Sequence, residues 1–132
     1  MNKTFVIIFV LLAISITGCA SDASDPSAPA TAIEAYLSAR IAKDDNVFQG
    51  TYCADFEVAA ITEFDSFGAV DAELTDMACS VDSIEDGVAS VSCTGSVDVV
   101  YDGEDNNSID LARATYRATQ EDGEWKMCGY SQ

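Results

Sequence analysis

The residues of this chain that could carry out chemistry are cysteines, tyrosines and carboxylates, because the sequence contains no histidine. Without histidine, Ser-His-Asp and Cys-His catalysis and most zinc sites are excluded. The cysteines are Cys19, Cys53, Cys79, Cys93 and Cys128. None of them forms a Cys-x-x-Cys pair, so the sequence predicts neither a metal site nor a redox-active dithiol, and it implies no cofactor.

A carboxylate base and a phenol that stabilises an oxyanion can together catalyse isomerisation in an apolar pocket. The chain has 23 acidic residues and 5 tyrosines, so both groups are plentiful. We expect Tyr36 and Tyr52 at a possible pocket, although the ordinary role for Tyr36 is to fill the core with its ring. No carboxylate stands at a matching place on an apolar face. We therefore assign no catalytic residue and favour a protein that is not an enzyme.

The charge of the chain is strongly negative, with 6 Lys and Arg against 23 Asp and Glu and a net charge of −17. Nucleic acid would be repelled, so it is excluded as a partner. The segment 102–110 is rich in oxygen ligands that calcium could use. However, Asn107 occupies the position where an EF-hand needs glycine, so we interpret the segment as a solvated connection.

Two arginines and the single tryptophan mark a cationic spot on this acidic chain. Arg113 and Arg117 are expected on one strand face, and Arg117 is expected opposite Met127 with Trp125 nearby. One interpretation is an outer sheet face with salt bridges and cation–π contacts. The other is a docking surface for a partner protein, because Trp and Arg often anchor interfaces.

The N-terminus has the pattern of an export signal. Lys3 precedes the apolar run 5–16, which is shorter than the roughly 20 residues of a membrane-spanning helix. The following Ile16-Thr17-Gly18-Cys19 resembles the lipobox of bacterial lipoproteins, whose cysteine accepts a diacylglycerol. The alternative is a signal cleaved elsewhere, with Cys19 an ordinary half-cystine.

The lipobox resemblance implies a mature chain that begins at a lipidated Cys19 and has 5 cations, 23 anions and a net charge of −18. Several acyl chains would hold it firmly on a membrane. Ala20 is not the aspartate that favours the inner membrane, so the resemblance implies the outer membrane if the cell has one. We expect a signal peptide at 1–18, the lipidated cysteine and a flexible tether at 19–30, and one folded domain at 31–132.

Helices are expected in the first half of that domain. Thr31 and Glu34 have the spacing of a capping box, and apolar residues at helical spacing follow up to Lys43. Asp44, Asp45 and Asn46 are expected to end this helix and cap the next one. The second expected helix carries Val47, Phe48, Tyr52 and Cys53, and a third carries Val58, Ile61 and Phe64.

Strands are expected from residue 70 onward, where the apolar period changes to two. The tripeptide Glu-Asp-Gly occurs at 85–87 and 121–123 and predicts three-residue turns in two hairpins, which pair 72–84 with 88–101 and 109–120 with 124–130. Gly95 predicts a bend or bulge inside the long second strand.

The expected turn at 85–87 places Cys79 opposite Cys93, which predicts a cross-strand disulfide. That pairing leaves Cys53, expected on a helix, to bridge Cys128 on the last strand.

This order of helices before strands predicts an α+β fold with two to three helices on a curved four-stranded antiparallel sheet. The segments 32–37, 43–45 and 123–128 resemble the nuclear transport factor 2-like superfamily, whose cone-shaped fold ketosteroid isomerase shares. More narrowly, they resemble small secreted bacterial lipoproteins of unknown function. A cystatin-like fold is the alternative.

Two functions follow. The favoured one is a lipid-anchored cell-envelope protein that binds a protein partner or a small apolar ligand without catalysis. The alternative, implied by the family resemblance, is a pocket enzyme of isomerase or dehydratase type. A deep cavity with an isolated acid would favour the enzyme, and a filled cone with an exposed face of Trp and Arg would favour the binding module.

Overall fold

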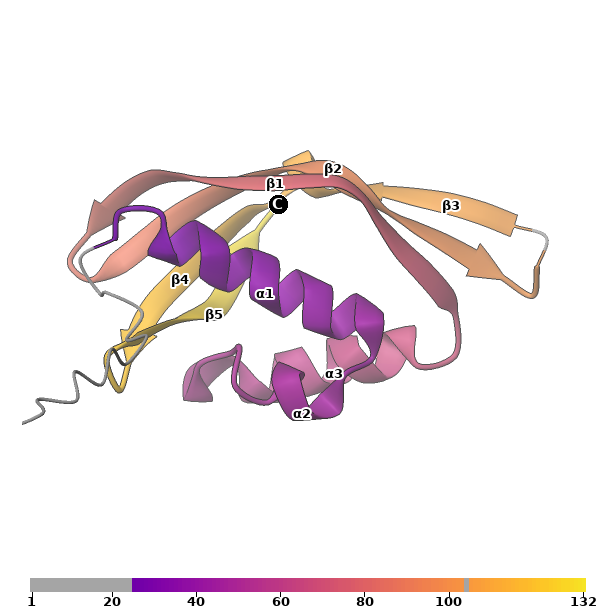
Figure 1. The fold of residues 1–132 in the computed structure, drawn as a ribbon, viewed down its shortest axis with the longest axis horizontal. Helices are drawn as coiled ribbons and strands as arrows, with labels where there is room; N and C mark the ends of the chain where they lie inside the picture. The colour runs from indigo at the N-terminus through magenta and orange to yellow at the C-terminus, as the bar shows by residue number, and fades with distance from the viewer. Residues whose placement is uncertain (1–24, 104) are drawn as a thin grey trace, which may run out of the picture.

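A computed structural model describes residues 25–103 and 105–132 (Figure 1). The expected signal peptide and Cys19 lie outside these residues. The elements are α1 (Ala28–Ala42), α2 (Asp45–Phe48), the 3₁₀ turn η1 (Ala54–Phe56), α3 (Glu57–Phe67), β1 (Asp71–Glu85), β2 (Val88–Tyr101), β3 (Asp105–Asp110), the 3₁₀ turn η2 (Leu111–Arg113), β4 (Thr115–Glu121) and β5 (Glu124–Ser131). The architecture is α+β, as expected.

The sheet is antiparallel and curved, and the helices lie on its concave side (Figure 1). Its strand order is β1-β2-β4-β5. The fifth strand, β3, was not expected as a separate strand. It pairs with the second half of β2, so part of the segment interpreted as a solvated connection is a hairpin arm.

Helix α1 begins before the expected capping box. Pro29 lies in its first turn, where the missing N–H costs nothing, so the helix starts at Ala28 inside the expected tether. Thr31 Oγ1 donates to Ser27 O at 3.3 Å. Glu34 does not cap the helix, because its Oε1 accepts the backbone N–H of Cys79 on β1 at 2.8 Å. The expected capping box is therefore wrong, and Glu34 ties α1 to the sheet.

Helix α2 ends sooner than expected, but its cap is confirmed: the Asp44 carboxylate accepts the Val47 N–H at 3.2 Å. Beyond the helix the chain extends alongside β5. Cys53 N donates to Met127 O, and Met127 N donates to Thr51 O, both at 2.9 Å. The expected helical setting of Cys53 is therefore wrong, although its disulfide to Cys128 is present, with a Cα–Cα distance of 5.3 Å.

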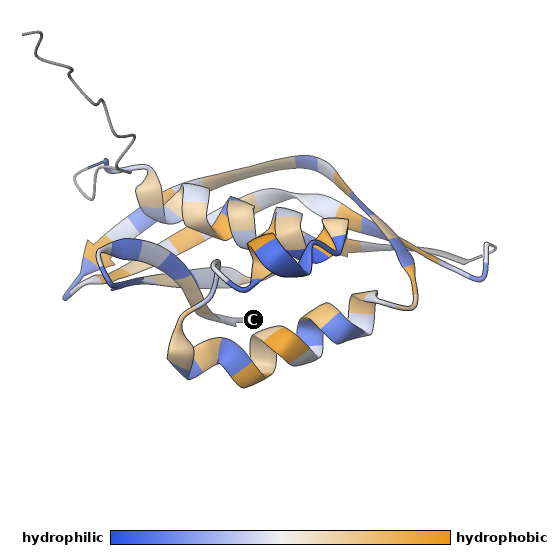
Figure 2. Ribbon diagram, turned by 60° about the horizontal axis from the view of Figure 1, so that its bottom comes forward, coloured by the Kyte–Doolittle hydropathy of each residue, from blue (hydrophilic) through white to orange (hydrophobic). Residues whose placement is uncertain are grey.

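Helix α3 turns only part of the expected face inward: Phe64 packs against the core as expected, but Val58 and Ile61 do not. Val58 is 81% exposed and Ile61 is 44% exposed, whereas Ala60 is fully buried. The inward stripe runs through Ala60, Glu63, Phe64 and Phe67, as its spacing of three and four residues allows. Figure 2 shows hydrophilic and hydrophobic residues alternating along this helix, so its apolar pattern alone does not select a face.

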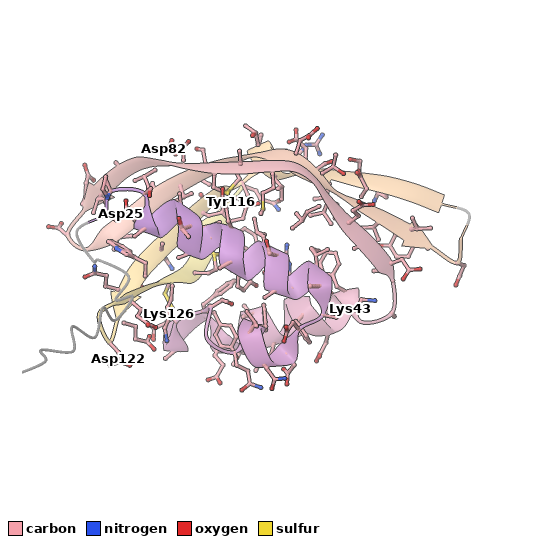
Figure 3. All side chains as sticks on the ribbon, in the orientation of Figure 1. Asp25, Lys43, Asp82, Tyr116, Asp122 and Lys126 are labelled. Atoms are coloured by element: carbon pink, nitrogen blue, oxygen red, sulfur yellow. A yellow bond between two sulfur atoms is a disulfide. The ribbon has the colours of Figure 1, made fainter. Side chains whose placement is uncertain are left out.

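The disulfide between Cys79 and Cys93 is confirmed, but the turn and register of the first hairpin differ from those used to predict it. The turn has two residues, Asp86 and Gly87, both with positive φ, so that Glu85 faces Val88. One extra residue, Asp82, then bulges on the outer side of β1 (Figure 3). The bulge shifts the register by one and brings the two cysteines opposite each other, with a Cα–Cα distance of 4.1 Å.

A second irregularity in the same hairpin confirms the expected bend at Gly95. Asp76 and Met77 of β1 oppose the single residue Gly95 of β2. Gly95 has φ +93°, and a Cβ there would lie 2.5 Å from Thr75 O. Only glycine tolerates both that φ and that approach, so this position sets where the sheet bends.

The second hairpin pairs β4 with β5, but its first strand begins at Thr115 rather than at 109 and its register differs from the expected one. Its turn is again two residues, Asp122 and Gly123, and Ala118 faces Met127. The expected pairing of Arg117 with Met127 is therefore wrong. Residues 111–114, expected at the start of this hairpin, instead form η2 and its C-cap.

The core lies between α1 and the concave face of the sheet. Its largest fully buried side chains include Tyr36, Ile33, Leu37, Val91 and Met127. Among the described residues, the two disulfides and the strand pairings of the sheet hold this core together. No helix in it is long and apolar enough to cross a membrane.

Candidate functional site

An open hollow of about 340 Å³ lies between the helices and the sheet, and we call it the central hollow. Most of its wall is apolar or aromatic and comes from α3, β2, η2, β4 and β5. These residues include Phe67, Val97, Leu111, Ala114, Tyr116 and Tyr130. Figure 3 shows Tyr116 on the inner side of the sheet, facing the helices. Val97 of this wall follows the bend at Gly95 by two residues.

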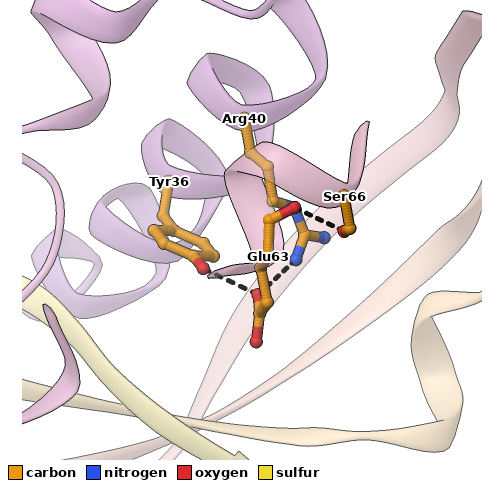
Figure 4. Close-up of polar contacts among 4 residues, drawn as sticks. All are labelled: Tyr36, Arg40, Glu63 and Ser66. Carbon is orange, nitrogen blue, oxygen red and sulfur yellow. Dashed lines mark hydrogen bonds and ion pairs between the residues drawn. The ribbon is translucent and has the colours of Figure 1, made fainter. Parts of the chain in front are cut away.

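A small polar cluster sits in this hollow, centred on Glu63 of α3 (Figure 4). Its Oε2 accepts the Tyr36 hydroxyl at 2.7 Å and forms an ion pair with Arg40 Nη1 at 2.5 Å. The guanidinium of Arg40 also lies over the rings of Tyr36 and Phe67, with centroid distances of 5.4 and 4.9 Å. Glu63 thereby joins the two helices through one carboxylate oxygen.

The positions of these groups follow from helix geometry. Tyr36 and Arg40 are four residues apart on α1 and so lie on the same face of the helix, one turn apart. Glu63 lies on the inward stripe of α3, and α3 packs against α1. The side chains of Arg40 and Glu63 are 12% and 18% exposed, so water screens their attraction less than at an open surface.

The tyrosines around the cluster hold their protons more tightly than usual. Burial raises the pKa of Tyr36, and the hydrogen bond to Glu63 raises it further. Burial also raises the pKa of Tyr116. For Tyr130, burial is again the larger cause of the raised pKa, and Glu63 adds to it. All three phenols are therefore neutral hydrogen-bond donors at physiological pH.

The charges of the hollow come in two acid–base sets. Arg40 and Glu63 neutralise each other inside, while Asp110 and Arg113 lie on the η2 side. The Asp110 carboxylate accepts the Ala112 N–H at 2.9 Å. Residues 25–103 and 105–132 contain no group of three or more potential metal ligands. This wall can hold an apolar molecule and orient it by a few hydrogen bonds.

Tyr36 and Tyr52, which were expected at one pocket, lie in different places. Tyr36 is fully buried and does not line the central hollow; its hydroxyl donates to Glu63, which does. Tyr52 lines a second groove of about 530 Å³ between α2, α3 and the β4–β5 turn. Phe48 links the two rings, with centroid distances of 5.2 Å to each.

The residues expected to form a partner face occupy three different settings. Arg113 belongs to η2 and lines the central hollow. Arg117 lies on β4 at a register shift, where its guanidinium donates to Cys128 O at 2.6 and 3.1 Å. Trp125 is partly buried against the core. The two arginines therefore do not share the strand face that was expected.

The sequence interpretation missed the carboxylate that matters most in this hollow. Glu63 was overlooked because the face of α3 was assigned to Val58 and Ile61. The sequence did contain a signal for this pair, one charged residue in the apolar stripe of each helix. Arg40 interrupts the stripe of α1, and Glu63 interrupts the stripe of α3 through Ala60 and Phe64. Opposite charges on two apolar stripes indicate a pair between packed helices.

Comparisons with known proteins reveal the fold alone. No protein-family model matches the sequence, and neither does any curated protein. A SEC-C motif-containing protein from Rhodopseudomonas palustris has a similar structure, with a TM-score of 0.53 and 10% identity over 80% of this chain and 79% of that one. An uncharacterized protein with a cystatin-like fold from Caulobacter vibrioides gives a TM-score of 0.51 and 18% identity over 76% and 82% of the two chains.

A candidate ketosteroid isomerase from Shewanella frigidimarina is also similar, with a TM-score of 0.49 and 15% identity over 80% of this chain and 95% of that one. At this score the likeness supports no conclusion about activity. Together with the observed helices on a curved antiparallel sheet, the similarity to the cystatin-like protein agrees with the expected α+β fold class.

Proposed function

We propose that this domain is a non-enzymatic binding module that holds a small apolar ligand in the central hollow. The observation that carries the proposal is the composition of the wall: it is mostly apolar and aromatic, and its charges balance, Glu63 with Arg40 on the inside and Asp110 with Arg113 on the η2 side. Ligand sites commonly combine a mostly apolar lining with few polar groups, and a volume of about 340 Å³ lies at the lower end of their range. A small ligand is favoured over a protein partner because the expected face of Arg113, Arg117 and Trp125 is dispersed.

The binding test uses an uncharged fluorescent probe, N-phenyl-1-naphthylamine, and the unlipidated chain 20–132 with both disulfides formed. Fluorescence should rise and saturate with the wild-type chain. Ala114→Phe places a ring in the hollow and should weaken binding at least tenfold. Ala112→Phe is the matched control, because Ala112 is exposed on the same turn and does not line the hollow.

Thermal melts of both variants should stay close to wild type, so that lost binding can be assigned to the filled hollow. Wild-type protein that leaves the probe dark would refute the proposal. Equal weakening by both variants would show that the probe binds elsewhere.

We further propose that the domain works while anchored to the cell envelope through a lipid on Cys19, on the outer membrane where the cell has one. The support is the lipobox resemblance at 16–19 and its apolar leader. Cys19→Ala should leave an unprocessed precursor that incorporates no labelled palmitate, while Cys53→Ala should still be labelled. Normal processing and labelling of the Cys19 variant would refute the anchor.

One observation favours the enzyme as the second candidate. Glu63 is a carboxylate in a mostly apolar hollow with protonated tyrosines beside it, which are the groups that proton abstraction next to a carbonyl needs. Its Oε2 is already held by Tyr36 and Arg40, which favours a structural role. Deuterium exchange into cyclohexanone, followed by NMR, tests this: exchange that Glu63→Gln abolishes would establish the enzyme.

A further inference from the structure

This inference rests on the proposed function and begins with the cations. The described residues contain five cationic side chains, and four have partners within the chain. These are Arg40 with Glu63, Lys126 with Glu121, Lys43 with Val70 O and Arg117 with Cys128 O. Arg113 is the fifth, and it makes no ion pair or hydrogen bond to any other residue that the structure describes. It lies in the wall of the central hollow.

The isolation of Arg113 is unusual in so acidic a chain. The whole chain has 6 Lys and Arg against 23 Asp and Glu, so acids greatly outnumber cations. The hollow itself contains two acids: Glu63 is paired with Arg40, while Asp110 accepts the backbone N–H of Ala112 and keeps its negative charge. Among the described residues the guanidinium of Arg113 pairs with neither acid, so its donors are free for a ligand.

The neighbours of Arg113 are apolar. Leu111 precedes it by two residues and is 3% exposed, while Ala114 follows it, and both line the hollow with Val97. A molecule that enters here meets these apolar residues, the Arg40–Glu63 pair, the Asp110 carboxylate and the unpaired guanidinium of Arg113. That arrangement complements an amphiphile with an apolar body and an anionic head.

We propose that the ligand of the central hollow is an amphiphilic carboxylate, whose head pairs with Arg113 and whose apolar body lies against Val97 and Leu111. Arginine suits this role because its planar guanidinium can donate two parallel hydrogen bonds to one carboxylate. The acidic remainder of the domain opposes the approach of an anion. At physiological salt the repulsion from acids more than about 8 Å away is largely screened. Within the hollow Arg40 neutralises Glu63, and Asp110 is the acid that reduces the preference for an anion.

The experiment compares three probes of one chain length: decanoate, decanol and decylammonium. Each is titrated into the disulfide-bonded chain 20–132 at pH 7.5, and the Kd is measured from amide NMR shifts, including those of Leu111 and Ala114. Decanoate should bind about fivefold more tightly than decanol, as expected for a partly exposed charged pair. Decylammonium should bind more weakly than either.

Variants at Arg113 distinguish the effect of its positive charge from that of its size. Arg113→Gln should abolish the preference for decanoate while leaving the Kd of decanol within about twofold of wild type. Arg113→Lys should keep part of the preference. Lys126→Gln removes the same charge from the other groove and should change nothing.

The outcomes distinguish this inference from the proposed function. Equal binding of decanoate and decanol, tighter binding of decylammonium, or a preference that survives in Arg113→Gln would overturn the carboxylate and leave the apolar site standing. Failure of all three probes to shift the hollow's amides would overturn both.

Discussion

Replacement of Gly95 by alanine tests the bend of the sheet beside the central hollow. Gly95 lies in β2 opposite Asp76 and Met77 of β1, at φ +93°. A Cβ at this position would lie 2.5 Å from Thr75 O and 2.6 Å from Asp76 O. Both obstacles are backbone atoms, which no change of side-chain rotamer can move aside.

The cost of Gly95→Ala has two parts. Holding an alanine at positive φ costs about 1–2 kcal/mol. Forcing its methyl group into a packed site costs about 1–3 kcal/mol more. The smaller entropy of the unfolded alanine variant offsets up to about 1 kcal/mol. We therefore expect a loss of roughly 1–5 kcal/mol in the free energy of unfolding, or about 5–25 °C in Tm for a domain of this size.

Gly87→Ala is the matched control. Gly87 also has positive φ, +77°, in the β1–β2 turn, but a Cβ there would meet nothing within 4 Å. Alanine at Gly87 should therefore show the conformational cost alone. The difference between the two variants in urea unfolding measures the backbone contact at Gly95, and we expect it to be about 1–3 kcal/mol.

Binding gives a second measurement. Val97 follows Gly95 by two residues and lines the hollow, so Gly95→Ala should also weaken N-phenyl-1-naphthylamine binding, whereas Gly87→Ala should not. If the two variants unfold at the same urea concentration, the close approach at Gly95 does not exist in solution. The explanation of the bend would then be wrong.

Three further predictions concern stability. The free energy of unfolding should fall above about pH 10, because burial and Glu63 raise the pKa of Tyr36 above that of an unfolded tyrosine. In urea melts the fall with pH should be less steep for Tyr36→Phe than for wild type, by about 1.4 kcal/mol per pH unit. Replacing Cys53 and Cys128 by serine should cost about 4.5 kcal/mol, against about 3 kcal/mol for Cys79 and Cys93, because the first bridge closes 75 residues and the second only 14; equal losses in denaturant melts would contradict this order. Sodium chloride should raise Tm as much as calcium chloride at matched ionic strength, because screening relieves the repulsion of this acidic chain; a rise with micromolar calcium alone would reveal a metal site.

The two Glu-Asp-Gly turns show how far local sequence determines this sheet. Both were expected as three-residue loops, and both are two-residue turns with Asp and Gly at positive φ. In the first hairpin the bulge at Asp82 restores the expected register, so Cys79 still meets Cys93. In the second hairpin no shift intervenes before Met127, so it faces Ala118 rather than Arg117. The turns were visible in the sequence, but the bulge at Asp82 was not.

The sequence by itself determined the order of helices before strands, both hairpins, the bend at Gly95 and the two cysteine pairings. These features depend on local signals: the period of apolar residues, Asp-Gly turns and a glycine inside a strand. The tertiary structure alone decided that β3 forms a separate strand and that Ala60 and Glu63, rather than Val58 and Ile61, face inward on α3. Two stripes of that short helix are similarly apolar, so its own pattern cannot choose between them. The choice depends on Arg40 of α1, because a partly buried guanidinium needs a carboxylate within reach, and only packing brings Glu63 there.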